Sequence, residues 1–195
     1  SGCAGSVQQR GGHRKQFGTK RGILVRDPLS TWGRTIDMGT KELLDALDRA
    51  ERARLHGGVA VWERLSCRAQ ALAPEMTAVE LCRALFAFHR AKYHDAGMIE
   101  AARDCILHEQ AGANASYNDV ALLLKAFSKH QCKDSTAVDY LLQRAADTLE
   151  YATPADTSQL LAAVLRLDMA DHLGADGRFP ELLSTLLEAT CRQLD

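Results

Sequence analysis

The sequence predicts an all-α protein, a right-handed solenoid of about four antiparallel helical hairpins that follows an extended basic N-terminal arm. From residue 39 onwards the chain is rich in Ala and Leu at the spacing of amphipathic helices. Helix-capping patterns recur there at nearly equal intervals. Before residue 39, Gly, Arg, Lys and Gln dominate and no helical or strand period is sustained. We therefore place the arm at 1–38 and the helical repeat domain at 39–195.

Composition narrows the class of protein. The 195 residues are 46% hydrophobic and 25% charged, which is typical of a globular domain with an ordinary core. No stretch approaches the roughly 18 consecutive apolar residues that a membrane-spanning helix needs. Aromatic residues make up 6% of the chain and prolines number four, which argues against a β-sandwich or a β-barrel.

The arm is basic, although the whole chain has a net charge of −1. Its basic side chains are Arg10, Arg14, Lys15, Lys20, Arg21, Arg26 and Arg34. Seven basic residues against two acidic ones give the arm a charge of +5, and 17 against 23 give the remaining chain −6. Its glycines oppose a free helix, so we expect the arm to become ordered against a partner. Its apolar anchors would be Ile23, Leu24, Val25 and Trp32.

In the helical domain each predicted unit pairs a first helix with a second helix. We expect first helices at 40–54, 77–91, 116–130 and 154–170, and second helices at 59–73, 96–110, 135–150 and 179–194. The breaks between them, such as 73–74 and 112–114, are short, and short connections make successive helices antiparallel. One amphipathic pair cannot bury its apolar face alone, so stacked pairs would bury it against their neighbours.

The predicted units share their first residues. Each begins with an N-cap residue and a carboxylate three positions later, as in a capping box: Thr77 with Glu80, Ser116 with Asp119, Thr153 with Asp156, and, more weakly, Gly39 with Glu42. These N-caps are 38, 39 and 37 residues apart, which gives units near 39–76, 77–115, 116–152 and 153–195. An ordinary helical bundle with coincidental spacing is the alternative.

The interiors of the first helices also align. Residues 77–88 match 116–127 without gaps, with Leu85 on Leu124 and Phe88 on Phe127. The period and the text of 116–129, Ser-Tyr-Asn-Asp-Val-Ala-Leu-Leu-Leu-Lys-Ala-Phe-Ser-Lys, resemble heptatricopeptide and octotricopeptide repeats. These repeats occur in organellar proteins of RNA metabolism, including the FAST-kinase-like and RAP-domain families.

This resemblance covers residues 39–195 as a loose consensus of core positions. It implies an organellar, mitochondrial protein associated with RNA or with the ribosome. No RAP-type module lies within the 195 residues, which is a departure from those families. Tetratricopeptide repeats fit less well because their period is about 34 residues, whereas armadillo or HEAT-type pairs remain compatible with the period.

No motif for catalysis or metal binding emerges. Residues 12–20 fail the P-loop pattern, because the spacing of Gly12 and Gly18 is one residue too long and the order of Thr19-Lys20 is reversed. His89 and His94 lie five positions apart, not the three or four that place two ligands on one helical face. The six cysteines form no Cys-x-x-Cys pair, so we expect free thiols in a reducing compartment and interpret Cys132 as inert.

We therefore expect a non-catalytic structural subunit of a mitochondrial ribosome in the matrix. Its helical domain, which we call the body, would pack on neighbouring proteins. The basic side chains of its arm would neutralise rRNA phosphates. Two alternatives remain: an accessory scaffold subunit of a respiratory or ATP-synthase type of complex without RNA, and a diffusible organellar RNA-processing factor. We expect no cofactor, metal ion, small-molecule substrate or membrane span.

Overall fold

The chain is described here by a computed structural model. It describes residues 35–55, 58–108 and 110–167, together with 184–185, 187–188 and 191. Throughout these residues the regular structure is helical, with eight α-helices and no strand. The prediction of an all-α protein is therefore confirmed.

The helices follow the order expected from the sequence. They are α1 (Thr40–Arg52), α2 (Val59–Leu72), α3 (Ala78–Arg90), α4 (Ala96–His108), α5 (Gln110–Ala113), α6 (Tyr117–His130), α7 (Ser135–Asp147) and α8 (Pro154–Leu167). Short 3-10 helices lie at Thr35–Asp37, Ala73–Glu75 and Leu149–Tyr151. The first seven expected helices thus begin within one residue of their predicted positions. The predicted helix at 179–194 falls largely outside the described residues.

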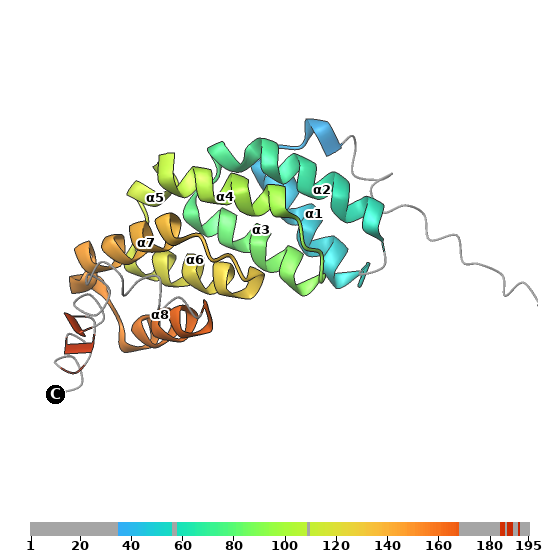
Figure 1. Ribbon diagram of the computed structural model, residues 1–195. Helices are drawn as coiled ribbons and strands as arrows, with labels where there is room; N and C mark the ends of the chain where they lie inside the picture. Colours follow the sequence, from blue (N-terminus) through green and yellow to red (C-terminus); the bar gives the residue numbers. More distant parts are fainter. Residues whose placement is uncertain are drawn as a thin grey trace, which may run out of the picture.

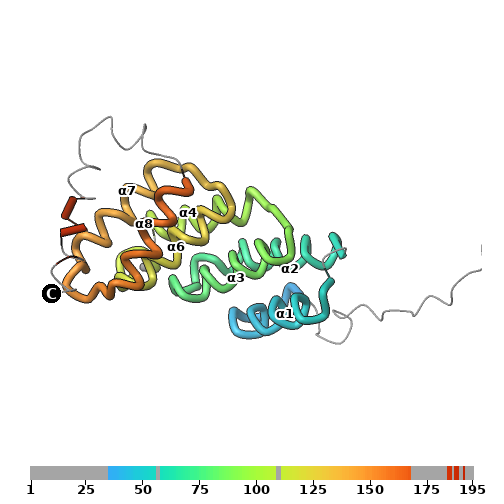
Figure 2. Tube along the Cα trace, turned by 90° about the horizontal axis from the view of Figure 1, so that it is seen from below, coloured from blue at the N-terminus to red at the C-terminus, as the bar shows by residue number. Residues whose placement is uncertain are grey.

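The long helices lie in two layers (Figures 1 and 2). Helices α1, α3, α6 and α8 form one layer, and each packs against the next. The other layer contains α2, α4 and α7, packed in the same sequential order. The layers are joined by contacts of α1 with α2, α3 with α4, and α6 with α7.

Polar contacts within the first layer join residues about one unit apart in the sequence. Arg83 Nη2 of α3 donates to Asp48 Oδ2 of α1 at 2.9 Å, 35 positions away. The Tyr117 hydroxyl of α6 donates to Thr157 Oγ1 of α8 at 3.0 Å, 40 positions away. The Thr157 hydroxyl in turn donates to the Thr153 carbonyl oxygen at 3.1 Å, so both buried hydroxyl groups are hydrogen-bonded.

The capping residues define the helix starts as the sequence predicts. Thr77 Oγ1 accepts from the Glu80 amide at 3.4 Å, and the Glu80 carboxylate accepts from the Thr77 amide at 2.9 Å. Ser116 and Asp119 make the same reciprocal pair. The Thr153 hydroxyl donates to Asp156 Oδ2 at 2.6 Å. Gly39 has no side-chain oxygen, so only one of the two capping-box hydrogen bonds forms there, from the Gly39 amide to the Glu42 carboxylate.

Aromatic and aliphatic side chains from both layers form one core. Trp62, Phe88 and Phe127 are each at most 1% exposed. The Trp62 ring meets the Phe88 ring edge to face, with centroids 5.9 Å apart. The indole Nε1–H of Trp62 is satisfied by the Leu55 carbonyl at 2.9 Å. The apolar stripes on the first helices are therefore core, as their helical spacing indicates.

The structure differs from the sequence prediction near residue 110. One helix was expected over 96–110 and a break over 112–114, but α4 ends at His108 and α5 occupies Gln110–Ala113. Gly112 makes this turn possible. A β-carbon at Gly112 would lie 2.1 Å from the Ile106 carbonyl oxygen and 2.8 Å from Tyr140 Cε1. Only a residue without a side chain allows this close approach.

Replacing Gly112 with Ala is expected to destabilise the protein by roughly 1–3 kcal/mol, because the added methyl meets a backbone atom that cannot rotate away. The measurement is the urea midpoint followed by circular dichroism. Gly97→Ala is the matched control, since a β-carbon there meets only the end of the Gln70 side chain. Equal midpoints for the two variants would contradict the steric account.

Candidate functional site

The RNA-binding and anchoring residues that the sequence predicts all lie outside the described residues. They comprise Arg10, Arg14, Lys15, Lys20, Arg21, Arg26 and Arg34, with Ile23, Leu24, Val25 and Trp32. The structure therefore brings none of them into a described site. Their roles stay predictions.

Many basic side chains of the body are bound within the body. Seven of them donate to carboxylates, carbonyls or an amide of the same chain: Arg64, Arg68, Arg83, Arg90, Arg103, Lys125 and Arg144. Two occupy equivalent places, since Arg68 Nε donates to the Met38 carbonyl at 2.7 Å and Arg144 Nε to the Ala115 carbonyl at 3.0 Å. Both carbonyls immediately precede an N-cap. These cations stabilise the packing of the units.

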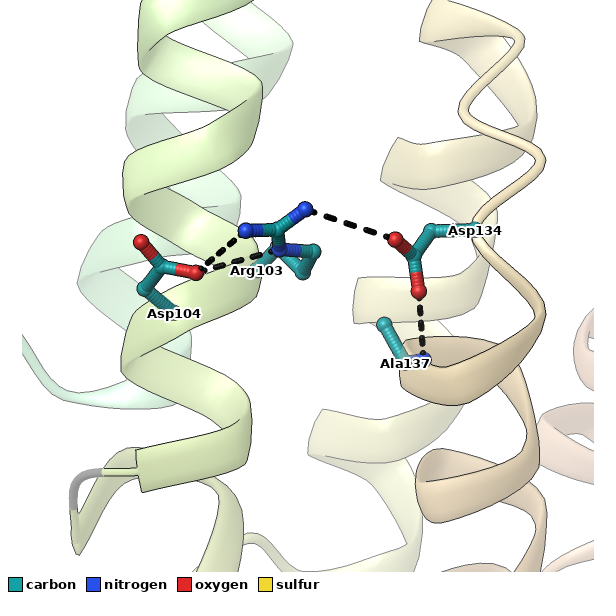
Figure 3. Close-up of polar contacts among 4 residues, drawn as sticks. All are labelled: Arg103, Asp104, Asp134 and Ala137. Atoms are coloured by element: carbon teal, nitrogen blue, oxygen red, sulfur yellow. Dashed lines mark hydrogen bonds and ion pairs between the residues drawn. The ribbon is translucent and has the colours of Figure 1, made fainter.

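Arg103 shows how such a cation joins two helices, α4 and α7 (Figure 3). Its guanidinium donates to Asp104 Oδ1 at 2.8 and 3.0 Å and pairs with Asp134 Oδ2 at 3.5 Å. The other Asp134 oxygen accepts from the Ala137 amide at 2.9 Å and so caps α7. The hydrogen bond to Asp104 raises the pKa of Arg103 above its ordinary value.

Three histidines meet between α3 and α6, an arrangement that sequence reasoning missed. The His130 ring lies edge to face with His89, at a centroid distance of 5.8 Å, and with His94, at 5.9 Å. His130 Nε2 lies 2.8 Å from the Leu85 carbonyl oxygen. Because a carbonyl only accepts, Nε2 carries a proton and donates it to this oxygen. The one signal in the sequence was that His89 and His130 are about one unit apart.

The pKa values of His130 and His89 are lowered, which favours their neutral state. Burial lowers the pKa of His130, and the neighbouring His89 and His94 lower it further, although the bond to Leu85 opposes them. Burial also lowers the pKa of His89, with help from Lys129, His94 and Arg90. Within the described residues no three His, Cys, Asp or Glu side chains are arranged to hold a metal ion. The ring contacts pack α3 and the turn after it against α6.

Acidification is expected to destabilise the fold through this cluster. A histidine whose pKa is lower in the folded protein than in the unfolded chain binds its proton more tightly in the unfolded chain. The free energy of unfolding therefore decreases as the pH falls below about 6.5, the ordinary pKa of histidine. The measurement is the melting temperature between pH 7.5 and 5.5. The double variant His89→Gln and His130→Gln should flatten this dependence, because it removes both groups whose pKa is lowered, whereas His108→Gln, at the exposed end of α4, should not. An unchanged slope in the double variant would refute this origin.

Burial makes the thiols of Cys132 and Cys82 harder to ionise. Burial raises the pKa of Cys132 above its ordinary value and outweighs the backbone hydrogen bond near Asp134. Burial and Asp119 raise the pKa of Cys82 to about 12. A thiol needs a lowered pKa to act as a nucleophile at neutral pH. The interpretation of Cys132 as an inert cysteine therefore agrees with its surroundings.

A groove runs between the N-terminal ends of α3 and α6. It encloses about 470 Å³ and is lined by Pro74, Glu75, Met76, Thr77, Ala78, Val79, Ala111, Asn114 and Asp119. Met76 and Ala111 are buried, while Val79 is 46% exposed. Two lining residues are acidic and none is basic. We call this hollow the α3–α6 groove.

Comparison with known proteins does not assign the chain to a family. The chain matches no protein-family model, no curated protein and no solved structure. Within the described residues, no helix is long and apolar enough to span a bilayer.

Proposed function

We propose that the chain is a helical-repeat structural subunit of a ribonucleoprotein, most specifically a mitochondrial ribosome, in which the arm binds rRNA and the body binds proteins. The body would be a right-handed solenoid of four antiparallel hairpins, with units near 39–76, 77–115, 116–152 and 153–195. The sequential packing in two layers and the equivalent arginine–carbonyl bonds support that architecture. The fourth hairpin would be completed by 179–194.

The functional proposal rests on the difference in charge between the arm and the body. Residues 1–38 have a charge of +5 and the remaining chain −6. Nucleic-acid affinity depends mainly on Lys and Arg side chains that replace counterions on the phosphates. In the described part of the body, seven such side chains are already bound to the chain itself. An acidic body repels phosphate, so the arm is the part suited to RNA.

This charge pattern also argues against a diffusible RNA-processing factor. A solenoid that reads RNA needs unpaired basic or stacking side chains repeated along one face. In the first layer, the carboxylates at the starts of successive helices repeat instead: Glu42, Glu80, Asp119 and Asp156. They suit protein contacts better than contacts with a polyanion.

The experiment is sedimentation of the native protein from a mitochondrial lysate, with and without ribonuclease. The proposal predicts that the protein travels with ribosomal particles and is released when the RNA is digested. A ribonuclease-resistant complex of similar size that lacks rRNA would overturn the proposal in favour of the scaffold subunit. Migration as a free small protein in both samples would overturn both.

A further inference from the structure

The α3–α6 groove combines an apolar floor with an acidic rim. Met76 is 3% exposed and Ala111 8% exposed, so their side chains form the floor, and Val79 leaves nearly half of its surface open beside them. Glu75 lies exposed on the rim. Asp119 lies on the opposite side, at the start of α6, where its Oδ2 atom accepts from the Ser116 amide at 3.0 Å. Because no lining residue is basic, the potential in the groove is negative.

We propose that in the absence of RNA this groove binds the chain's own arm, at residues 20–26. This segment reads Lys-Arg-Gly-Ile-Leu-Val-Arg. Ile23, Leu24 and Val25 would supply apolar side chains for the floor. Lys20 or Arg21 on one side and Arg26 on the other would meet the carboxylates of the rim. A volume of about 470 Å³ falls in the ordinary range for sites that enclose a few side chains.

The arm is long enough to reach this groove. Thr35, where the described chain begins, lies nine positions after Arg26, and an extended chain spans roughly 3.3–3.6 Å per position. Met38 and Met76 each immediately precede the N-cap residue of successive first-layer helices, α1 and α3. Neighbouring packed helices lie about 8–10 Å apart. A span of about 30 Å therefore covers the one or two helix spacings between Thr35 and the groove.

Binding of the arm to its own body would regulate the RNA contact. The same Lys and Arg side chains cannot meet the rim carboxylates and RNA phosphates together, so RNA must displace the arm. This consequence rests on the proposed function. The intramolecular contact itself does not, because it requires only the groove and the segment 20–26.

The test places a photo-crosslinking residue, p-benzoylphenylalanine, at Val79 in the full chain without RNA. The proposal predicts a crosslink to residues 17–29 of the same molecule, and polyuridylate should reduce it. The variant Glu75→Lys should reduce the yield several-fold, while circular dichroism confirms that the chain remains folded. The control places the same residue at Leu165 of α8, which is 79% exposed and distant from the groove in sequence.

Three results would overturn this inference: crosslinks that join two copies, crosslinks confined to residues 35–167, and no crosslink above the Leu165 control. None of them bears on whether the arm binds RNA, which the sedimentation experiment measures separately. A crosslink to 17–29 in a protein that never associates with RNA would support the groove contact and refute the proposed function.

Discussion

Replacing Phe127 with Ala is expected to cost about 3–5 kcal/mol of unfolding free energy. Phe127 is fully buried in α6, the helix that packs against α3 on one side and α8 on the other. Truncation would leave a cavity in the core, which the surrounding helices can close only in part. Domains of this size have a total stability of about 5–15 kcal/mol, so the variant would lie near the limit of folding.

The measurement is a urea titration monitored by circular dichroism. Phe86→Ala is the matched control, because Phe86 is only partly buried and packs at the edge of the same core. Its loss should be clearly smaller. Equal losses for the two variants, or a loss below about 1 kcal/mol for Phe127→Ala, would contradict the placement of α6 at the centre of the fold.

Replacing the seven basic residues of the arm with Gln is expected to abolish most RNA affinity. For single strands, the slope of log K against log salt is about −0.7 for each phosphate neutralised. Seven contacts would make the natural chain lose on the order of 10³-fold in affinity between roughly 50 and 200 mM salt. The variant should bind weakly, with a nearly flat dependence on salt. Filter binding to polyuridylate across this range measures both slopes.

The control removes charge from the body instead. Lys129→Gln with Lys133→Gln alters two basic residues beside the histidine cluster and leaves the arm intact. The account predicts that the salt slope of this double variant equals that of the natural chain. If the body variant flattened the slope and the arm variant did not, RNA would bind to the helices and the division of roles would be wrong.

The starts of the helices could be predicted from the sequence because the signals that set them are local. A capping box is complete within four residues, so Thr77 with Glu80 and Ser116 with Asp119 locate α3 and α6 without any tertiary information. The spacing of those caps then suggests which helices are neighbours. Hydroxyl pairing between Tyr117 and Thr157, 40 positions apart, agrees with that order.

The features that the sequence could not predict depend on contacts between helices. The end of α4 and the separate helix α5 depend on the approach of Gly112 to the Ile106 carbonyl, which no helical period encodes. The histidine cluster forms because the turn after α3 brings His94 beside His130 of another helix. Likewise, the α3–α6 groove belongs to neither unit alone, so its lining could be identified only in three dimensions.

The most direct test of the account is ultraviolet crosslinking of the native protein to RNA, with the modified residues located by mass spectrometry. If the arm binds RNA and the body binds proteins, nucleotide adducts will fall within residues 10–34. Adducts along α1, α3, α6 and α8 instead would show that the helices bind RNA and would contradict the account. An absence of adducts from a protein recovered in a large complex would show that the basic arm binds a protein neighbour.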